Sequence, residues 1–326
     1  MYIIVVIYAI TAALLYSGSA SRQFSNMLIS VSCYVVMAIS LNLVVGFLGE
    51  LSLGHAGFMS VGLFSGCLFS IGTVGSLPLI VRLPVAMLIG GVAAAIVGLL
   101  VGLPALRLKG DYLAIVTLAC GEIIKNVITN LDITGGALGL NTGSIYSNSK
   151  ALLPYAIVLV LITALVMMNI ENSRHGRAIM AIRDNRIAAE AMGINVTYYK
   201  LLVFVIAAFF AGMAGALYGH SFANVKATSF DYNTSIEILV IVVLGGMGSV
   251  RGSIIAAIVL RALPECLRIP GFSDYRMLLY AILLIIIMLF NANPRFAEMK
   301  GRWNIRSLVL AARGKLGKEK EAGSNG

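Results

Sequence analysis

The chain has few charged side chains. Asp, Glu, Lys and Arg make up 12% of its 326 residues, whereas hydrophobic residues make up 59%, and the mean hydropathy is +0.94. Soluble domains use about twice as much charge, so this composition excludes a soluble protein. Apolar runs of about 20 residues recur along the chain, and each is long enough to cross a hydrocarbon core of about 30 Å as a helix. We therefore expect an integral membrane protein.

Residues that would support metal, disulfide or nucleotide chemistry are also scarce. The chain has 3 His and 4 Cys, and the cysteines stand singly in apolar surroundings without C-x-x-C spacing, so we predict neither a metal site nor a disulfide framework. No G-x-x-x-x-G-K-[ST] phosphate loop is present. The first apolar run, 2–18, lacks a preceding basic stretch and a clear cleavage site, which favours a retained span over a signal peptide. We expect the chain to perform no catalysis and to bind no cofactor.

Basic residues gather in three places, which predict the topology. They are Arg107 and Lys109; Arg174, Arg177, Arg183, Arg186 and Lys200; and a tail with Arg295, Lys300, Arg302, Arg306, Arg313, Lys315, Lys318 and Lys320. Because cytoplasmic loops are rich in Lys and Arg, all three are placed inside. The net charge of +10 is thereby attributed to these loops, and no nucleic acid partner is predicted. Both termini are then cytoplasmic, with spans near 2–18, 27–47, 56–75, 80–104, 111–131, 151–170, 200–222 and 274–292.

One apolar segment does not fit a simple span. Residues 234–263 must begin and end outside, yet they form two apolar stretches of about ten residues around the sequence GGMGSVRG, whose glycines are unfavourable in a helix. Non-helical backbone at membrane depth survives only when it is buried in protein or lines a water-filled cavity. We therefore predict a broken, re-entrant hairpin. The expected fold is an all-α polytopic bundle with about eight full spans plus this hairpin.

The predicted domains are a permease domain over 1–293, which contains a cytoplasmic loop at 172–199, and a basic cytoplasmic tail over 294–326. The tail is expected to be solvated near anionic lipid.

A second break, GFLGELSLGHAGF, interrupts the apolar sequence between Gly46 and Phe58. Transporters use interrupted helices to line substrate pathways, so both breaks are pathway candidates. The candidate residues are Gly49, Glu50, Ser52, Gly54 and His55 in the first break, and Gly245, Gly246, Gly248, Ser249 and Gly252 in the second. A lone histidine such as His55 is also explained by an ordinary structural hydrogen bond.

Glu122 and Lys125 are ionisable residues within a predicted span, where charge is unfavourable. Three positions apart, they can lie on one helical face and form an ion pair. Two interpretations stay open, a structural pair and a pathway role.

The stretch from Arg174 to Lys200 is the most polar one in the body of the chain. Apolar stripes among its charges predict short amphipathic helices on the cytoplasmic face. Glu190 lies among alanines, and Gly193 follows as a helix end. The stretch is either an ordinary basic loop or a helix that docks into another protein.

The segment AIRDNRIAAEAMGINVTYYKLLVFVIAAFFAGMAGALYG, Ala181 to Gly219, closely resembles the central region of permease subunits of branched-chain amino acid ABC transporters of the LivM type. The resemblance continues through LNLVVGFLGELSLGHAGFMSVG, LRLKGDYLAIVTLACGEIIKNV, LDITGGALGL and LVIVVLGGMGSVRGSIIAAIVLRALPE. It covers nearly all of the chain from Ser40 to Asn293.

This resemblance implies a coupling helix of the EAA type that inserts into an ATPase subunit. The matching residues are Arg183, Asp184, Glu190, Ala191 and Gly193. It also implies a second permease subunit, two ATP-binding subunits that hold ATP and Mg, an extracytoplasmic solute-binding protein, and a bacterial or archaeal inner membrane.

Two alternatives remain. Related ABC permeases carry urea, amides, other amino acids or sugars. A protein of another class, a gradient-driven secondary transporter or channel, would use Glu50, Glu122 or Lys125 as an ion relay.

Overall fold

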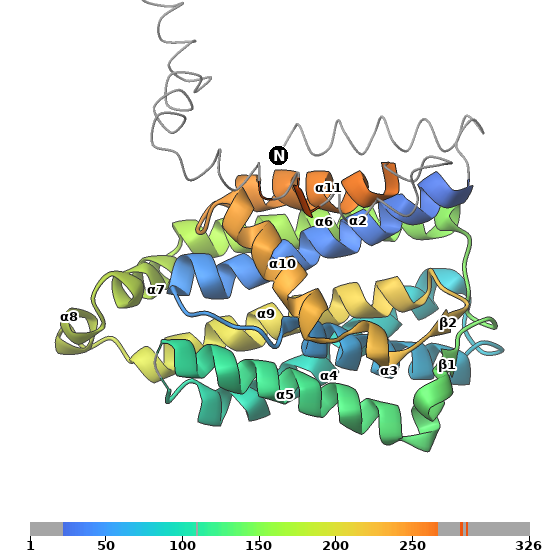
Figure 1. The fold of residues 1–326 in the computed structure, drawn as a ribbon, viewed down its shortest axis with the longest axis horizontal. Helices are drawn as coiled ribbons and strands as arrows, with labels where there is room; N and C mark the ends of the chain where they lie inside the picture. Colours follow the sequence, from blue (N-terminus) through green and yellow to red (C-terminus); the bar gives the residue numbers. More distant parts are fainter. Residues whose placement is uncertain (1–21, 109, 267–280, 283–284, 286–326) are drawn as a thin grey trace, which may run out of the picture. The chain divides into compact units, whose positions relative to one another are not determined.

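The computed structural model describes residues 22–108, 110–266, 281, 282 and 285, and residues 22–266 belong to one compact unit. That unit is helical (Figure 1). Its longer helices are α2 (Arg22–Asn42), α3 (His55–Gly72), α4 (Leu79–Ala105), α5 (Asp111–Asn130), α6 (Ser149–Asn172), α9 (Val196–Gly219), α10 (Tyr232–Gly245) and α11 (Val250–Cys266). The predicted span 2–18 and the tail 294–326 lie outside the described residues, as does all but a few residues of 274–292.

Seven helical segments in the described part are long and apolar enough to cross a membrane. Six of them, Ser25–Leu48, His55–Gly72, Leu79–Ala105, Asp111–Asn130, Ser149–Asn172 and Val196–Gly219, match predicted spans. The seventh, Ala227–Gly245, is the first arm of the predicted hairpin together with the turn before it. The predicted polytopic α-helical fold is confirmed.

The hairpin is present, but its arms are longer than predicted. Helix α10 has 14 residues and α11 has 17, where about ten each were expected. Helix α10 starts early because the Asp231 carboxylate caps it, accepting a hydrogen bond of 3.1 Å from the backbone N–H of Thr234. Gly246 and Gly248 turn the chain with φ of 93° and 81°, a left-handed conformation that favours glycine.

Helix α9 lies at the centre of the unit and packs against α3 and α4. Glycines allow this close approach. A side chain at Gly212 would lie 2.5 Å from the carbonyl oxygen of Gly90 in α4, and one at Gly62 in α3 would overlap the backbone of Gly212. The small residues of α9 thus serve packing within the chain, as in other membrane helices.

Two ends of the unit can be told apart in Figure 1. A short antiparallel ribbon pairs β1 (Leu140–Asn141) with β2 (Asn224–Val225), with Leu140 opposite Val225. Helices α7 (Arg174–Asp184) and α8 (Arg186–Ala191) lie at the other end. We call these the ribbon end and the α8 end.

Candidate functional site

The polar stretch predicted to form short amphipathic helices folds into α7 and α8, as expected. Three polar residues start the helices of this region, because the side-chain oxygen of each accepts a hydrogen bond of 3.1 Å from a backbone N–H three residues later. Ser173 caps α7, Asn185 caps α8 and Asn195 caps α9. The sequence thus starts two short helices between the spans α6 and α9.

Gly193 lies two residues after the end of α8, and its φ is 82°. The backbone N–H groups of Gly193 and Ile194 bond back to the carbonyls of Glu190 and Ala189, at 3.0 and 3.1 Å, which is a Schellman ending. The predicted role of Gly193 as a helix terminator is confirmed.

The surface of α8 is partly apolar. Ile187 is 80% exposed and Met192 is 82% exposed, although both lie next to the charged pair in which Arg186 Nε donates to Glu190 Oε1 at 2.9 Å. Ala189 is buried and Ala191 is exposed. Large apolar side chains that are exposed on a short polar loop are typical of a docking surface.

At the end of α7, Arg183 contacts the first break. Its Nη1 donates a hydrogen bond of 2.9 Å to the carbonyl oxygen of Gly46, which lies in a π-helical segment, η1 (Leu43–Leu48), at the end of α2. Gly49 has φ of 76°, and a Cβ there would lie 2.5 Å from Arg183 Cγ. Glycine at 49 is therefore required both by the backbone conformation and by the arginine stem. Arg183 also pairs with Asp184 at 3.2 Å.

The hairpin tip meets the first break at the same place. The backbone N–H of Gly248 donates to Asn42 Oδ1 at 2.9 Å, and a Cβ built on Gly46 would overlap both the Gly248 nitrogen and Asn42 Oδ1. Asn42, Gly46, Gly49, Arg183 and Gly248 are called the glycine junction below. It joins both predicted breaks to the predicted coupling loop.

A second link joins the first break to the other end of the loop. Glu50 forms an ion pair with Lys200, which lies in the first turns of α9. The side chains are 14% and 5% exposed, so the pair is shielded from water, and removal of either partner would leave a shielded charge without compensation. Helices α7 and α8 are thus tied to the first break on both sides, by Arg183 and by Lys200.

The remaining residues of the first break point to α5 and α2. The backbone N–H of Leu53 donates to Thr117 Oγ1 at 3.0 Å, and a Cβ at Gly54 would lie 2.5 Å from the Thr117 carbonyl oxygen. His55 is buried, and its Nε2 is hydrogen-bonded to Ser40 Oγ at 2.8 Å, as the structural interpretation predicts. Ser52 is buried, and its Oγ has no hydrogen-bond partner among the described residues.

The other candidates of the second break build the turn itself. A Cβ at Gly245 would lie 2.6 Å from Ser253 Cα, and the backbone N–H of Gly252 donates to Ser249 Oγ at 3.2 Å. Gly245, Gly246 and Gly252 therefore let the two arms touch directly at the turn.

Glu122 and Lys125 form the predicted ion pair. Glu122 Oε1 also accepts a hydrogen bond of 3.0 Å from the backbone N–H of Tyr232, the first residue of α10. The pair therefore holds the start of α10, whereas the glycine junction holds its far end, roughly 20 Å away for a helix of this length. The predicted pathway residues thus form two separate groups.

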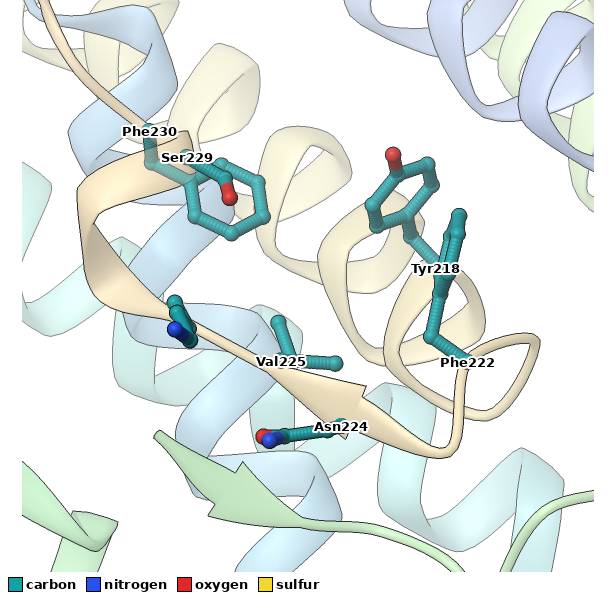
Figure 2. Close-up of a pocket in the computed structure, with 7 residues that line it drawn as sticks. Tyr218, Phe222, Asn224, Val225, Ser229 and Phe230 are labelled. Atoms are coloured by element: carbon teal, nitrogen blue, oxygen red, sulfur yellow. The ribbon is translucent and has the colours of Figure 1, made fainter. Parts of the chain in front are cut away.

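The ribbon end has a pocket of about 250 Å³ that the sequence did not reveal (Figure 2). Its aromatic rings come from the end of α9, from the connection to β2 and from the segment after β2, and the centroids of Tyr218 and Phe222 are 4.7 Å apart. The lining residues are Tyr218, Phe222, Asn224, Val225, Lys226, Ser229 and Phe230.

These features define a class: a polytopic helical membrane protein with a broken hairpin whose tip is bonded to the end of α2, beside the contact of a helical loop with the same segment, as expected of a transport permease. Comparison with known proteins gives the family. The profile described as "Branched-chain amino acid transport system / permease component" matches residues 23–288. The chain belongs to this family.

Three relatives illustrate its range. The chain is 34% identical over 293 residues to the high-affinity branched-chain amino acid transport system permease protein LivM of Salmonella typhimurium, covering 79% of this chain and 66% of the relative. The permease protein LivH of the same organism is 31% identical over 152 residues, 45% of this chain and 49% of LivH. The ribose import permease protein RbsC of Haemophilus influenzae is 24% identical over 283 residues, 82% and 84% of the two chains. The chain thus spans about two thirds of the length of the LivM protein it matches.

Proposed function

We propose that this chain is the membrane-spanning permease subunit of an ATP-driven importer of branched-chain or other hydrophobic amino acids. The family and the LivM relative support this cargo. The observation that carries the mechanism is the double anchorage of the α7–α8 loop to the first break, through Arg183 on Gly46 and through Lys200 on Glu50. A loop built only as a solvated connection has no need of two links to the bundle, one of which is shielded from water.

In this mechanism an ATP-binding subunit binds α8 through Ile187 and Met192, beside the carboxylate of Glu190. A displacement of α8 moves α7 and the start of α9, because the capped helices are short and rigid. Arg183 then pulls on the Gly46 carbonyl, and the first break moves the hairpin tip through Asn42 and Gly248. Packed elements of this kind switch between discrete arrangements, which suits alternating access.

The proposed partners follow from the family. A second permease subunit would complete a heterodimer, as LivM and LivH are both named permease proteins of a high-affinity branched-chain amino acid transport system. Two ATP-binding subunits would hold ATP and Mg, and an extracytoplasmic solute-binding protein would deliver the cargo. We place the chain in a bacterial or archaeal inner membrane, with the α8 end and both termini in the cytoplasm.

A different cargo within the same class is the second candidate, because the ribose permease RbsC is similar to 82% of this chain. A gradient-driven carrier is less well supported, since the Glu50 and Glu122 carboxylates are each paired with a lysine. Uptake of labelled leucine and of ribose into vesicles that contain the co-expressed ATPases, second permease and binding protein distinguishes these candidates. ATP-dependent leucine uptake supports the proposal, and uptake by this chain alone under an ion gradient contradicts it.

Ile187→Glu is expected to prevent binding of the ATPase subunits, because it places a carboxylate on the apolar docking face of α8. Burial of an isoleucine at an interface contributes about 1.5–3 kcal/mol, and loss of that contact lowers affinity at least about tenfold. Co-purification of the ATPases with the tagged chain measures the effect. Leu138→Glu is the matched control, because Leu138 is 82% exposed at the ribbon end. Equal ATPase recovery with both variants would show that α8 is not the docking site.

A further inference from the structure

A second pocket, of about 200 Å³, lies at the α8 end, and the proposed coupling mechanism does not use it. It forms where the end of α4 meets the starts of α8 and α9. The lining residues are Gly102, Leu103, Leu106, Arg107, Arg186, Thr197 and Leu201.

The polar side of this pocket is basic. Arg107 follows the end of α4 and Arg186 opens α8, so two separate elements bring guanidinium groups to one cavity. Arg186 uses its Nε–H for Glu190, and a guanidinium has further N–H donors. Arg107 has no ion pair among the residues that the structure describes. Two arginines and the Thr197 hydroxyl match the acceptor oxygens of a phosphate group.

The other side is apolar and continues along the membrane helix. Exposed apolar side chains follow one another on α4 towards the pocket, three or four residues apart except for one adjacent pair, at Val92, Ile96, Leu99, Leu100 and Leu103. Positions with this spacing lie on one helical face. From Val92 to Leu103 the stripe is roughly 17 Å long, about half of the hydrocarbon thickness of a bilayer.

We propose that this pocket binds the phosphate headgroup of an anionic phospholipid, with an acyl chain along the α4 stripe. A free phosphate would use the arginines but not the stripe. Basic pockets between membrane helices on the cytoplasmic side have the chemistry that such headgroups require. Because Arg186 is the first residue of α8, the bound lipid would hold the docking helix at the membrane surface.

The test uses the full chain purified in mild detergent and offered phosphatidylglycerol, with retained lipid counted by native mass spectrometry. The double variant Arg107→Gln/Arg186→Gln is expected to bind at least about tenfold less lipid, since each arginine near an anionic surface contributes to the attraction. Arg107→Lys/Arg186→Lys keeps the charge and should retain much of the binding, which guards against misfolding as the cause. Arg174→Gln/Arg177→Gln is the matched control, because these exposed arginines lie in α7 at the same end.

Four results would overturn the proposal: equal loss of lipid in the control, loss of lipid in the Lys variant as well, displacement of lipid by inorganic phosphate, or unchanged lipid binding with loss of the ATPases. The third would indicate a free phosphate site, and the last a contact with the motor. Lipid counting needs neither ATP nor cargo. A negative result in the lipid-binding test therefore does not contradict the proposed transport function. A negative result in the uptake test does not contradict the proposed lipid site.

Discussion

Gly46→Ala is expected to abolish substrate uptake while the chain still inserts into the membrane. The new methyl group would overlap the backbone nitrogen of Gly248 and the amide oxygen of Asn42. The Gly248 backbone cannot rotate away from the new methyl group as a flexible side chain could. The hairpin tip must therefore move away from the first break. Overpacking of this kind costs about 1–3 kcal/mol of stability, and the loss of transport should be far larger than that because the tip loses its contact with the segment that Arg183 holds.

Two glycine controls make this expectation specific. Gly75→Ala has no atom within 4 Å of the new methyl and should transport normally. Gly62→Ala overlaps the Gly212 backbone between α3 and α9, so it damages packing away from the junction. Uptake per folded molecule and the melting temperature are measured for all three variants. If Gly46→Ala and Gly62→Ala lose uptake only in proportion to stability, the junction has no special role.

Much of the fold can be predicted because apolar length and glycine position are local signals. Six spans follow from runs of about 20 apolar residues. The two breaks follow from glycines in apolar sequence, and the ends of α8 follow from Asn185 and Gly193. Each of these signals depends on residues within one or two helical turns of the position concerned.

The length of the hairpin arms cannot be predicted from nearby residues, because it depends on contacts with other elements. The second arm contains an arginine, Arg261, whose partners lie in other elements. In the structure Arg261 Nη1 donates to Glu237 Oε1 at 3.2 Å, and its guanidinium carbon lies 4.0 Å from the centre of the Tyr34 ring. The neighbouring arm and α2 therefore satisfy the charge, and α11 continues to Cys266.

The contacts of the glycine junction could not be predicted either, because they also join residues that are far apart in the sequence. Arg183 and Gly46 are 137 residues apart, and Gly248 and Asn42 are 206 apart. The sequence marks Arg183, Gly49 and Gly248 as candidates but has no pattern that pairs them. Asn42 and Lys200 were not predicted as site residues. Asn42 could have been recognised as a candidate because it places a polar amide within the apolar run that leads to the first break.

Lys200→Met is expected to uncouple ATP hydrolysis from uptake, and so is Glu50→Gln. Either change leaves a shielded charge without its partner, which costs about 3–5 kcal/mol when such a pair is fully buried. One Glu50 oxygen, Oε2, already lacks a hydrogen-bond partner among the described residues, so the carboxylate relies on Lys200. A movement of the loop at its α9 end would then no longer be transmitted to the first break. ATPase activity should continue in the assembled complex while leucine uptake falls.

The charge-reversed pair Glu50→Lys/Lys200→Glu separates coupling from general damage. If the link acts through the ion pair itself, the double variant should recover a large part of the uptake that each single variant loses, as a double-mutant cycle measures. Lys150→Met removes an exposed lysine at the start of α6 and should leave uptake and ATPase activity unchanged. Strict additivity of the two losses in the double variant would mean that Glu50 and Lys200 act independently. In that case the loop would be tied to the first break through Arg183 alone.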